Sequence, residues 1–87
     1  MVFIAFDVEA TGLINPDTDD PVFQPEIIEF GAIKWGAKKP STLSLLIKPS
    51  KPIPELITKI TSISDSDVKS AKSFFANFYE IGRYAFY

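Results

Sequence analysis

Two acidic side chains near the start of the chain, Asp7 and Glu9, are spaced so that both could bind one metal site. They follow the apolar run 2–6, which predicts a strand buried on both faces. Because side chains alternate along a strand, both carboxylates leave the same face, roughly 6.5 to 7 Å apart along the backbone. Mg²⁺ and Mn²⁺ prefer carboxylate oxygens, and two-ion phosphoryl-transfer sites use convergent carboxylates. The pair indicates metal-assisted phosphodiester chemistry, although a strand that simply ends in two solvated acids has the same pattern.

A longer string around these acids resembles a known family. The segment from Phe6 to Leu13, FDVEATGL, resembles the first motif of the DEDD-type 3′→5′ exonucleases, the proofreading-exonuclease family with an RNase H-like fold. Later segments are similar to the family's next elements in the same order: 26–34 to its second strand, 47–54 to its third strand and exit, and 60–65 to its leucine-threonine-glycine-isoleucine-threonine segment. The resemblance covers about Val2 to Phe86, so we interpret residues 1–87 as the N-terminal portion of a single exonuclease domain.

This resemblance implies a function and a set of site residues. The family hydrolyses the terminal phosphodiester bond and releases a nucleoside monophosphate. Asp7 and Glu9 match its catalytic, metal-binding acids, which hold two Mg²⁺ or Mn²⁺ ions. Thr11, Gly12 and Leu13 match its substrate-binding positions, with Leu13 against the terminal base. The expected partner is the 3′ end of single-stranded DNA or RNA, and a DNA polymerase is a further partner that the resemblance suggests.

The chain departs from the family pattern after its first motif. The family also needs two further aspartates and a general base, all from later in its domain. The segment Arg83–Phe86 resembles the strand just before the third acid, and the chain contains no histidine. We therefore expect this chain by itself to be inactive or nearly so. Two other functions stay open: a non-catalytic interaction module, and a weak nucleic-acid-binding module that keeps the Thr11–Leu13 pocket.

Composition narrows the class of protein. A chain of 87 residues forms one small domain of marginal stability. The net charge of −2 argues against a protein that coats nucleic acid more than against a nuclease that holds phosphates through metal ions. The sequence contains no cysteine, no apolar run of 18 residues and no signal-peptide pattern at its N-terminus. These features predict a cytoplasmic protein without a membrane span.

The expected fold is α/β, a truncated RNase H-like fold. Consecutive strands at 2–9, 27–35 and 42–48 predict a three-stranded antiparallel meander, with the proline-rich loop 14–25 in solvent and a turn at 36–40. Glu29 lies in the second strand, where we favour a structural role, such as pairing with a lysine, over a place in the acidic site.

Helices are expected to pack on this sheet. They are predicted at 55–61, at 64–71 from a capping box at Ser64 and Asp67, and at an aromatic stripe that ends at Gly82. The stripe, made by Phe74, Phe75, Phe78, Tyr79 and Ile81, is interpreted as core packing rather than a base-stacking platform. A short fourth strand could form at Tyr84–Tyr87. In the family that the chain resembles, the first strand is central in the sheet, and this short strand is all that could cover its second edge. The apolar edge and face that stay exposed predict a dimer, an aggregate or dependence on a partner.

Overall fold

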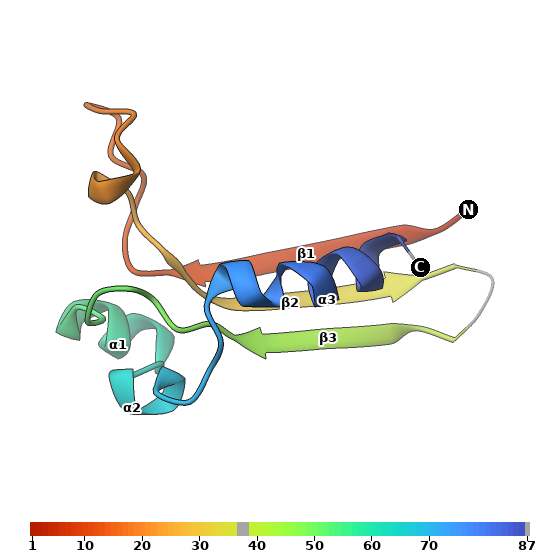
Figure 1. Ribbon diagram of the computed structural model, residues 1–87. Coiled ribbons are helices and arrows are strands. Elements are labelled where there is room, and N and C mark those ends of the chain that lie inside the picture. The colour runs from red at the N-terminus through yellow and green to blue at the C-terminus, as the bar shows by residue number, and fades with distance from the viewer. Residues whose placement is uncertain (37–38, 87) are drawn as a thin grey trace.

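A three-stranded antiparallel sheet is the framework of the computed structural model, which describes residues 1–36 and 39–86. The strands are β1 (Phe3–Ala10), β2 (Ile27–Trp35) and β3 (Ser41–Leu46), in the order β1-β2-β3 (Figure 1). The predicted meander is confirmed: the second strand has the predicted bounds, and the ends of the first and third strands are shifted by one or two residues. The turn predicted at 36–40 includes residues 37–38, which lie outside the described residues.

A β-bulge shapes the end of the sheet where the two acids lie. Glu9 is in register with Glu29, but the next residue, Ala10, is in register with Ile27. Ile28 is therefore the extra residue of the bulge, and its carbonyl accepts a hydrogen bond from Ile47 N–H at 2.8 Å. Ile28 is completely buried, so the bulge places the most enclosed side chain of the core.

Two short helices pack at this same end of the sheet. Helix α1 spans Glu55–Thr61, as predicted. The residue that caps its C-terminus, Ser62, adopts the left-handed conformation with φ 66° and ψ 11°. Helix α2 spans Asp65–Val68 and is shorter than the predicted 64–71.

The predicted capping box begins α2. The Ser64 N–H and hydroxyl donate to Asp67 Oδ2 at 2.8 and 3.0 Å, and Asp67 N–H donates to Ser64 Oγ at 3.3 Å. The hydrogen bond from the Ser64 backbone, followed by that from its hydroxyl, lowers the pKa of Asp67 below 3.8.

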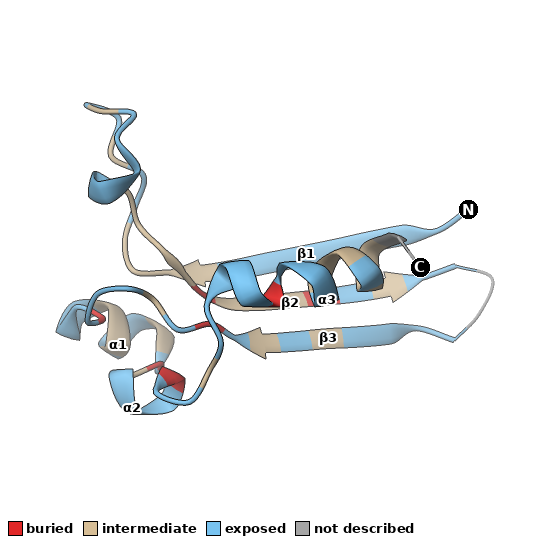
Figure 2. Cartoon of the chain, viewed as in Figure 1, coloured by how far each residue is buried: buried red, intermediate tan, exposed pale blue. Residues whose placement is uncertain are grey.

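The hydrophobic core lies between the bulged end of the sheet and these two helices (Figure 2). Its buried members are Ile28, Ile53, Ile63 and Val68, and Ile57 and Ala71 pack against them half-buried. The Asp65 carboxylate closes this cluster by accepting a hydrogen bond from Ile53 N–H at 2.8 Å. This core is small for 87 residues, and many large apolar side chains elsewhere are exposed. The molecule should therefore have modest stability.

The third helix, α3 (Phe74–Phe86), lies along one face of the sheet (Figure 1). Its end is anchored by Tyr84, whose hydroxyl donates to Ser41 O at 2.7 Å and whose carbonyl accepts from Lys34 Nζ at 3.0 Å. The fourth strand expected at Tyr84–Tyr87 is therefore wrong for residues 84–86, and Tyr87 lies outside the described residues. The helix continues through Gly82, contrary to the prediction. Ile81 before this glycine and Tyr84 and Ala85 after it contact the sheet, and these contacts offset the modest cost of a glycine in a helix.

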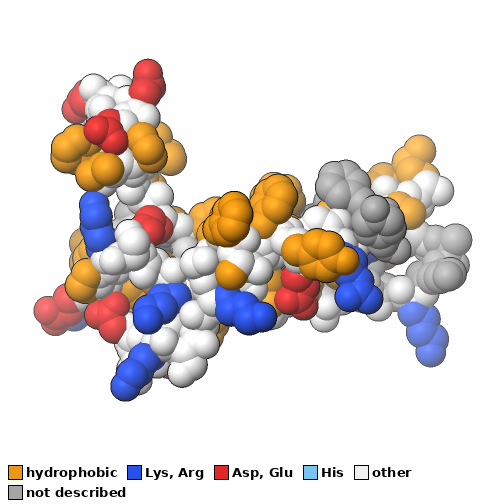
Figure 3. Space-filling view, in the orientation of Figure 1, with side chains coloured by type: hydrophobic (Ala, Val, Ile, Leu, Met, Phe, Trp, Pro, Cys, Tyr) orange, Lys and Arg blue, Asp and Glu red, His pale blue; other side chains and the backbone are white. Residues whose placement is uncertain are grey.

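The prediction that the aromatic stripe packs in the core is wrong for Phe75, Phe78 and Tyr79 and is confirmed for Ile81. Ile81, Tyr84 and Ala85 face the sheet, across a hollow of about 350 Å³ that Ile4, Phe6, Phe30 and Ala32 also line. Phe75 and Phe78 are 89% and 65% exposed, and Tyr79 is exposed as well. Apolar side chains gather accordingly on the outer surface of α3 in Figure 3. The periodicity predicted the helix correctly, but the half-buried face is the one that carries Ile81, Tyr84 and Ala85.

Strand β1 is not buried on both faces, contrary to the sequence-based expectation. Phe3, Ile4, Phe6 and Val8 are all exposed. The physical reason is position: β1 is an edge strand among the described residues, and α3 lies toward β2 and β3. No helix within residues 1–36 and 39–86 is long and apolar enough to cross a membrane.

Candidate metal and nucleotide site

Asp7 and Glu9 lie on the face of the sheet opposite α3. Ile4 and Phe6 share a hollow with α3, so the even-numbered side chains of β1 point toward the helix. The alternate side chains, which include both acids, must then point away from it. This face is open in the described part of the chain, because α1 and α2 lie beyond the sheet's end and α3 lies on the other side (Figure 1). The predicted pairing of the two carboxylates on one accessible face is therefore present.

The surroundings of these acids leave their charge uncompensated. Asp7 is exposed and Glu9 is half-buried. Asp7 Oδ1 accepts a hydrogen bond from the backbone N–H of Val8 at 2.9 Å. Within residues 1–36 and 39–86 the only ion pair joins Lys59 to Glu55 on α1, so neither acid has a basic partner there. Carboxylates in such a position can accept a cation without first breaking a salt bridge.

Glu29 adds a third carboxylate to this neighbourhood. It is directly opposite Glu9 in the antiparallel register, so the two side chains leave the same face. No described lysine forms an ion pair with it, and the lysine pairing that was considered for Glu29 is absent from the described residues. The sequence placed Glu29 on one face of the second strand, but only the register shows that this face is the one that carries Glu9.

The carboxylate oxygens of this site are the type of ligand that a hard divalent cation prefers. Mg²⁺ is commonly held by one or two carboxylates, with waters and substrate phosphates as the other ligands. Asp7 and Glu9 supply that minimum. Three or more metal-binding side chains do not converge anywhere in the described ranges. The arrangement therefore fits one ion in part, and a two-ion site requires further ligands.

The predicted nucleotide-contacting residues follow β1 directly. Thr11 closes the base of the next loop, because its N–H donates to Glu26 O and its Oγ1 accepts from Glu26 N–H, both at 2.9 Å. Gly12 has no positive φ, and an added Cβ would meet nothing within 4 Å, so its backbone does not require glycine. Leu13 is 93% exposed and is available for contact with a ligand.

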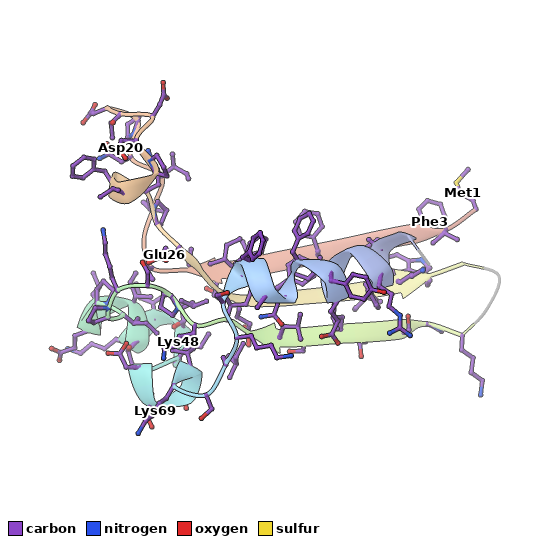
Figure 4. All side chains as sticks on the ribbon, in the orientation of Figure 1. Met1, Phe3, Asp20, Glu26, Lys48 and Lys69 are labelled. Atoms are coloured by element: carbon purple, nitrogen blue, oxygen red, sulfur yellow. The ribbon has the colours of Figure 1, made fainter. Side chains whose placement is uncertain are left out.

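The loop that follows projects from the sheet and is organised by one side chain. Gln24 donates to Asn15 O and Thr18 O at 2.9 and 2.7 Å and accepts from Asn15 N–H at 2.8 Å. Asp20 begins the short 3₁₀ helix η1 (Pro21–Phe23) by accepting from Val22 N–H at 3.0 Å. Figure 4 shows Asp20 in the projecting part of this loop and Glu26 at its base.

Glu26 ties this loop to the segment that leaves β3. Its carboxylate accepts from the Ser50 N–H at 2.9 Å and from the Ser50 hydroxyl at 3.0 Å. Thr11, the first residue of the segment 11–13, is therefore held at a defined place next to the acids.

Comparisons with known proteins agree with this arrangement. The exonuclease family model RNase_T matches residues 4–84. A relative, the PolC-type DNA polymerase III of Caldanaerobacter subterraneus subsp. tengcongensis, is 43% identical over 70 residues. That match covers 79% of this chain and 4% of the polymerase.

Solved structures share the fold at low sequence identity. The nuclease domain of 3′hExo, a DEDDh family member bound to rAMP, has a TM-score of 0.73 at 19% identity and aligns with 95% of this chain. Cell-death related nuclease 4 has a TM-score of 0.74 at 16% identity and aligns with 97% of this chain. This chain spans 42% and 29% of those two structures. With the family model matching nearly its whole length, this chain belongs to the exonuclease family, and it spans only part of the length of the proteins it matches.

Proposed function

We propose that this chain provides the first metal-binding acids and the nucleotide-contacting segment of a 3′→5′ exonuclease. The observation that carries the proposal is the pair Asp7 and Glu9, which share an open face beside the segment 11–13 and have no basic partner among the described residues. The proposed substrate is the 3′ end of single-stranded DNA or RNA. Hydrolysis would add water at the terminal phosphorus and break the bond to the 3′ oxygen, releasing a nucleoside monophosphate.

The residues of this chain would have separate roles in the reaction. Asp7 and Glu9 would hold Mg²⁺ or Mn²⁺, which supplies charge stabilisation and an activated water when bound. Leu13, at the exposed end of the segment, would contact the terminal base, while Thr11 keeps the segment in place through its two bonds to Glu26. Glu29 would lie next to this site and add negative charge. The remaining ligands and the general base would come from polypeptide outside residues 1–87.

The proposed context is a cytoplasmic proofreading exonuclease. Support comes from the PolC-type polymerase relative, although the match covers only 4% of that protein. A separate structure in the same fold group is described as a 3′-exonuclease that recognises the 3′ end of a histone mRNA stem-loop. A polymerase partner and a nucleic-acid 3′ end are therefore the partners to test first.

Metal titration tests the central claim directly. We expect Mn²⁺ to bind the chain, as followed by electron paramagnetic resonance of free Mn²⁺, and Asp7→Asn to weaken binding at least about tenfold, because half of the proposed carboxylate ligands are lost. Asp19→Asn is the matched control, since Asp19 is an exposed acid in the loop. Equal binding by all three proteins, or no binding at all, would favour the non-catalytic interaction module.

Nuclease assays test the need for further ligands. With Mg²⁺ or Mn²⁺ and a 3′-labelled single-stranded oligonucleotide, the isolated chain should release almost no nucleotide. Clear turnover that Asp7→Ala abolishes would show that these residues are sufficient, and the requirement for outside ligands would be wrong.

A further inference from the structure

An open groove at the end of the molecule that carries α1 and α2 is lined by three lysines from two separate segments. Lys48 and Lys51 lie in the segment that leaves β3, and Lys69 is the residue that caps the C-terminus of α2. The groove has a volume of about 470 Å³, and Figure 4 shows Lys48 and Lys69 at the same end of the molecule as Glu26. The fold therefore gathers positive charge that is dispersed in the sequence.

The groove is positively charged although the whole chain has a net charge of −2. All three lysines are exposed, and the only ion pair within residues 1–36 and 39–86 joins Lys59 to Glu55 on α1. One acid, Asp65, also lines the groove. Lys72 adds a further positive charge beside it, because Lys72 O accepts a hydrogen bond from Lys48 N–H at 3.0 Å. The lysines outnumber the acid, so the groove should attract an anion.

Hydrogen bonds connect this groove to the nucleotide-contacting segment. Glu26 joins the two, because its backbone bonds to Thr11 and its carboxylate accepts from the N–H and hydroxyl of Ser50, which lines the groove. Lys51, the next residue, donates from Nζ to Val22 O at 2.8 Å, in the loop that follows the nucleotide-contacting segment. A ligand that extends from that segment across Glu26 would therefore meet the lysines of the groove.

We propose that this groove binds the phosphate backbone of the nucleic-acid strand whose 3′ nucleotide enters the acid site, an inference that rests on the proposed function. Lysine ammonium groups bind phosphates as point charges. No aromatic side chain is among the described residues that line the groove, so bases have no stacking surface there and binding should not depend on sequence. A docking site for a protein would typically carry aromatic anchors instead.

The groove and the acid site would bind different parts of one strand. Asp7 and Glu9 are negatively charged and need a cation before they can hold a phosphate, whereas the lysines attract phosphates directly. Binding of a single strand through the groove should therefore persist when divalent metal ions are removed.

Fluorescence anisotropy of a labelled oligothymidylate, measured with a chelator over a range of potassium chloride concentrations, tests the groove. Three phosphate contacts predict that log K falls with log salt concentration at a slope of about −2. Lys48→Gln and Lys69→Gln should each make this slope shallower by about 0.7 and weaken binding about fivefold at about 0.1 M salt. Lys39→Gln is the matched control, because it removes the same charge from an exposed lysine just before β3, at the other end of that strand.

The outcomes separate this proposal from the proposed function. No binding in the chelator, or equal binding by the groove variants and the Lys39→Gln control, would overturn the groove. Equal competition by poly-L-glutamate would identify an acidic protein as the partner and would overturn it as well. If Mn²⁺ fails to bind the acid site while Lys48→Gln and Lys69→Gln still weaken oligonucleotide binding, the groove stands and the proposed metal site is wrong.

Discussion

Glu9 and Glu29 show how single residues shape the acid site. They are directly opposite each other across β1 and β2, with Cα atoms about 5.5 Å apart, and no described basic side chain pairs with either. Like charges in such a pair destabilise a sheet. The proposed cation site therefore lies where the protein has an electrostatic cost that a bound cation would relieve.

Removing one of these charges should stabilise the metal-free protein. We expect Glu29→Gln to raise the free energy of unfolding by about 0.2–1 kcal/mol, measured by urea denaturation with a chelator present. Asp19→Asn, which removes an exposed loop charge, should change it much less. If Glu29→Gln destabilises the protein instead, Glu29 has a favourable partner in solution and the repulsion argument fails.

At the level of elements, the end of α1 carries avoidable backbone strain. Ser62 is the only non-glycine residue with a positive φ in residues 1–36 and 39–86, and its N–H donates to Thr58 O at 2.8 Å. The left-handed conformation is costly for a residue with a Cβ and is usually taken by glycine at a helix C-terminus. The exonuclease segment that 60–65 resembles has glycine at this position, so this chain departs from the family pattern where the backbone still needs it.

Replacing this residue should therefore stabilise α1. We expect Ser62→Gly to raise the free energy of unfolding by about 0.5–1 kcal/mol, because relief of the left-handed strain exceeds the entropy that glycine adds to the unfolded chain. Ser62→Ala keeps the Cβ and serves as the control, with no gain expected. Thermal unfolding followed by circular dichroism measures both, and an equal gain in the two variants would locate the effect in the hydroxyl rather than in the backbone.

For the molecule as a whole, stability depends on one small core at one end of the sheet. Ile28 has 0% exposure and contacts the other members of that core, whereas the opposite end of the sheet is held to α3 mainly through Tyr84. A domain of this size is typically stable by only about 4–13 kcal/mol. The loss of one central side chain should therefore lower the free energy of unfolding of the whole fold.

Truncation of Ile28 tests this dependence. We expect Ile28→Ala to lower the free energy of unfolding by about 2–5 kcal/mol, through lost burial and the cavity it leaves. Ile60→Ala is the control, since Ile60 lies on α1 with 69% exposure and should cost under about 1 kcal/mol. Urea denaturation compares the two, and similar costs would mean that the core does not lie where the structure places it.

Local pattern was sufficient for much of this protein. The alternation of side chains put Asp7 and Glu9 on one face, the strand at 27–35 and the helix at 55–61 had the predicted bounds, and the capping box at Ser64 formed as read, because each depends on residues close in the chain. The motif from Phe6 to Leu13 likewise indicated the family.

Tertiary contacts decided the rest. Three features depend on neighbours far away in the sequence. They are the edge position of β1 among the described strands, the half-buried face of α3 with Ile81, Tyr84 and Ala85, and the helical state of residues 84–86. The pairing of Glu29 with Glu9 depends on the register, and a register combines two strands that local patterns describe only one at a time.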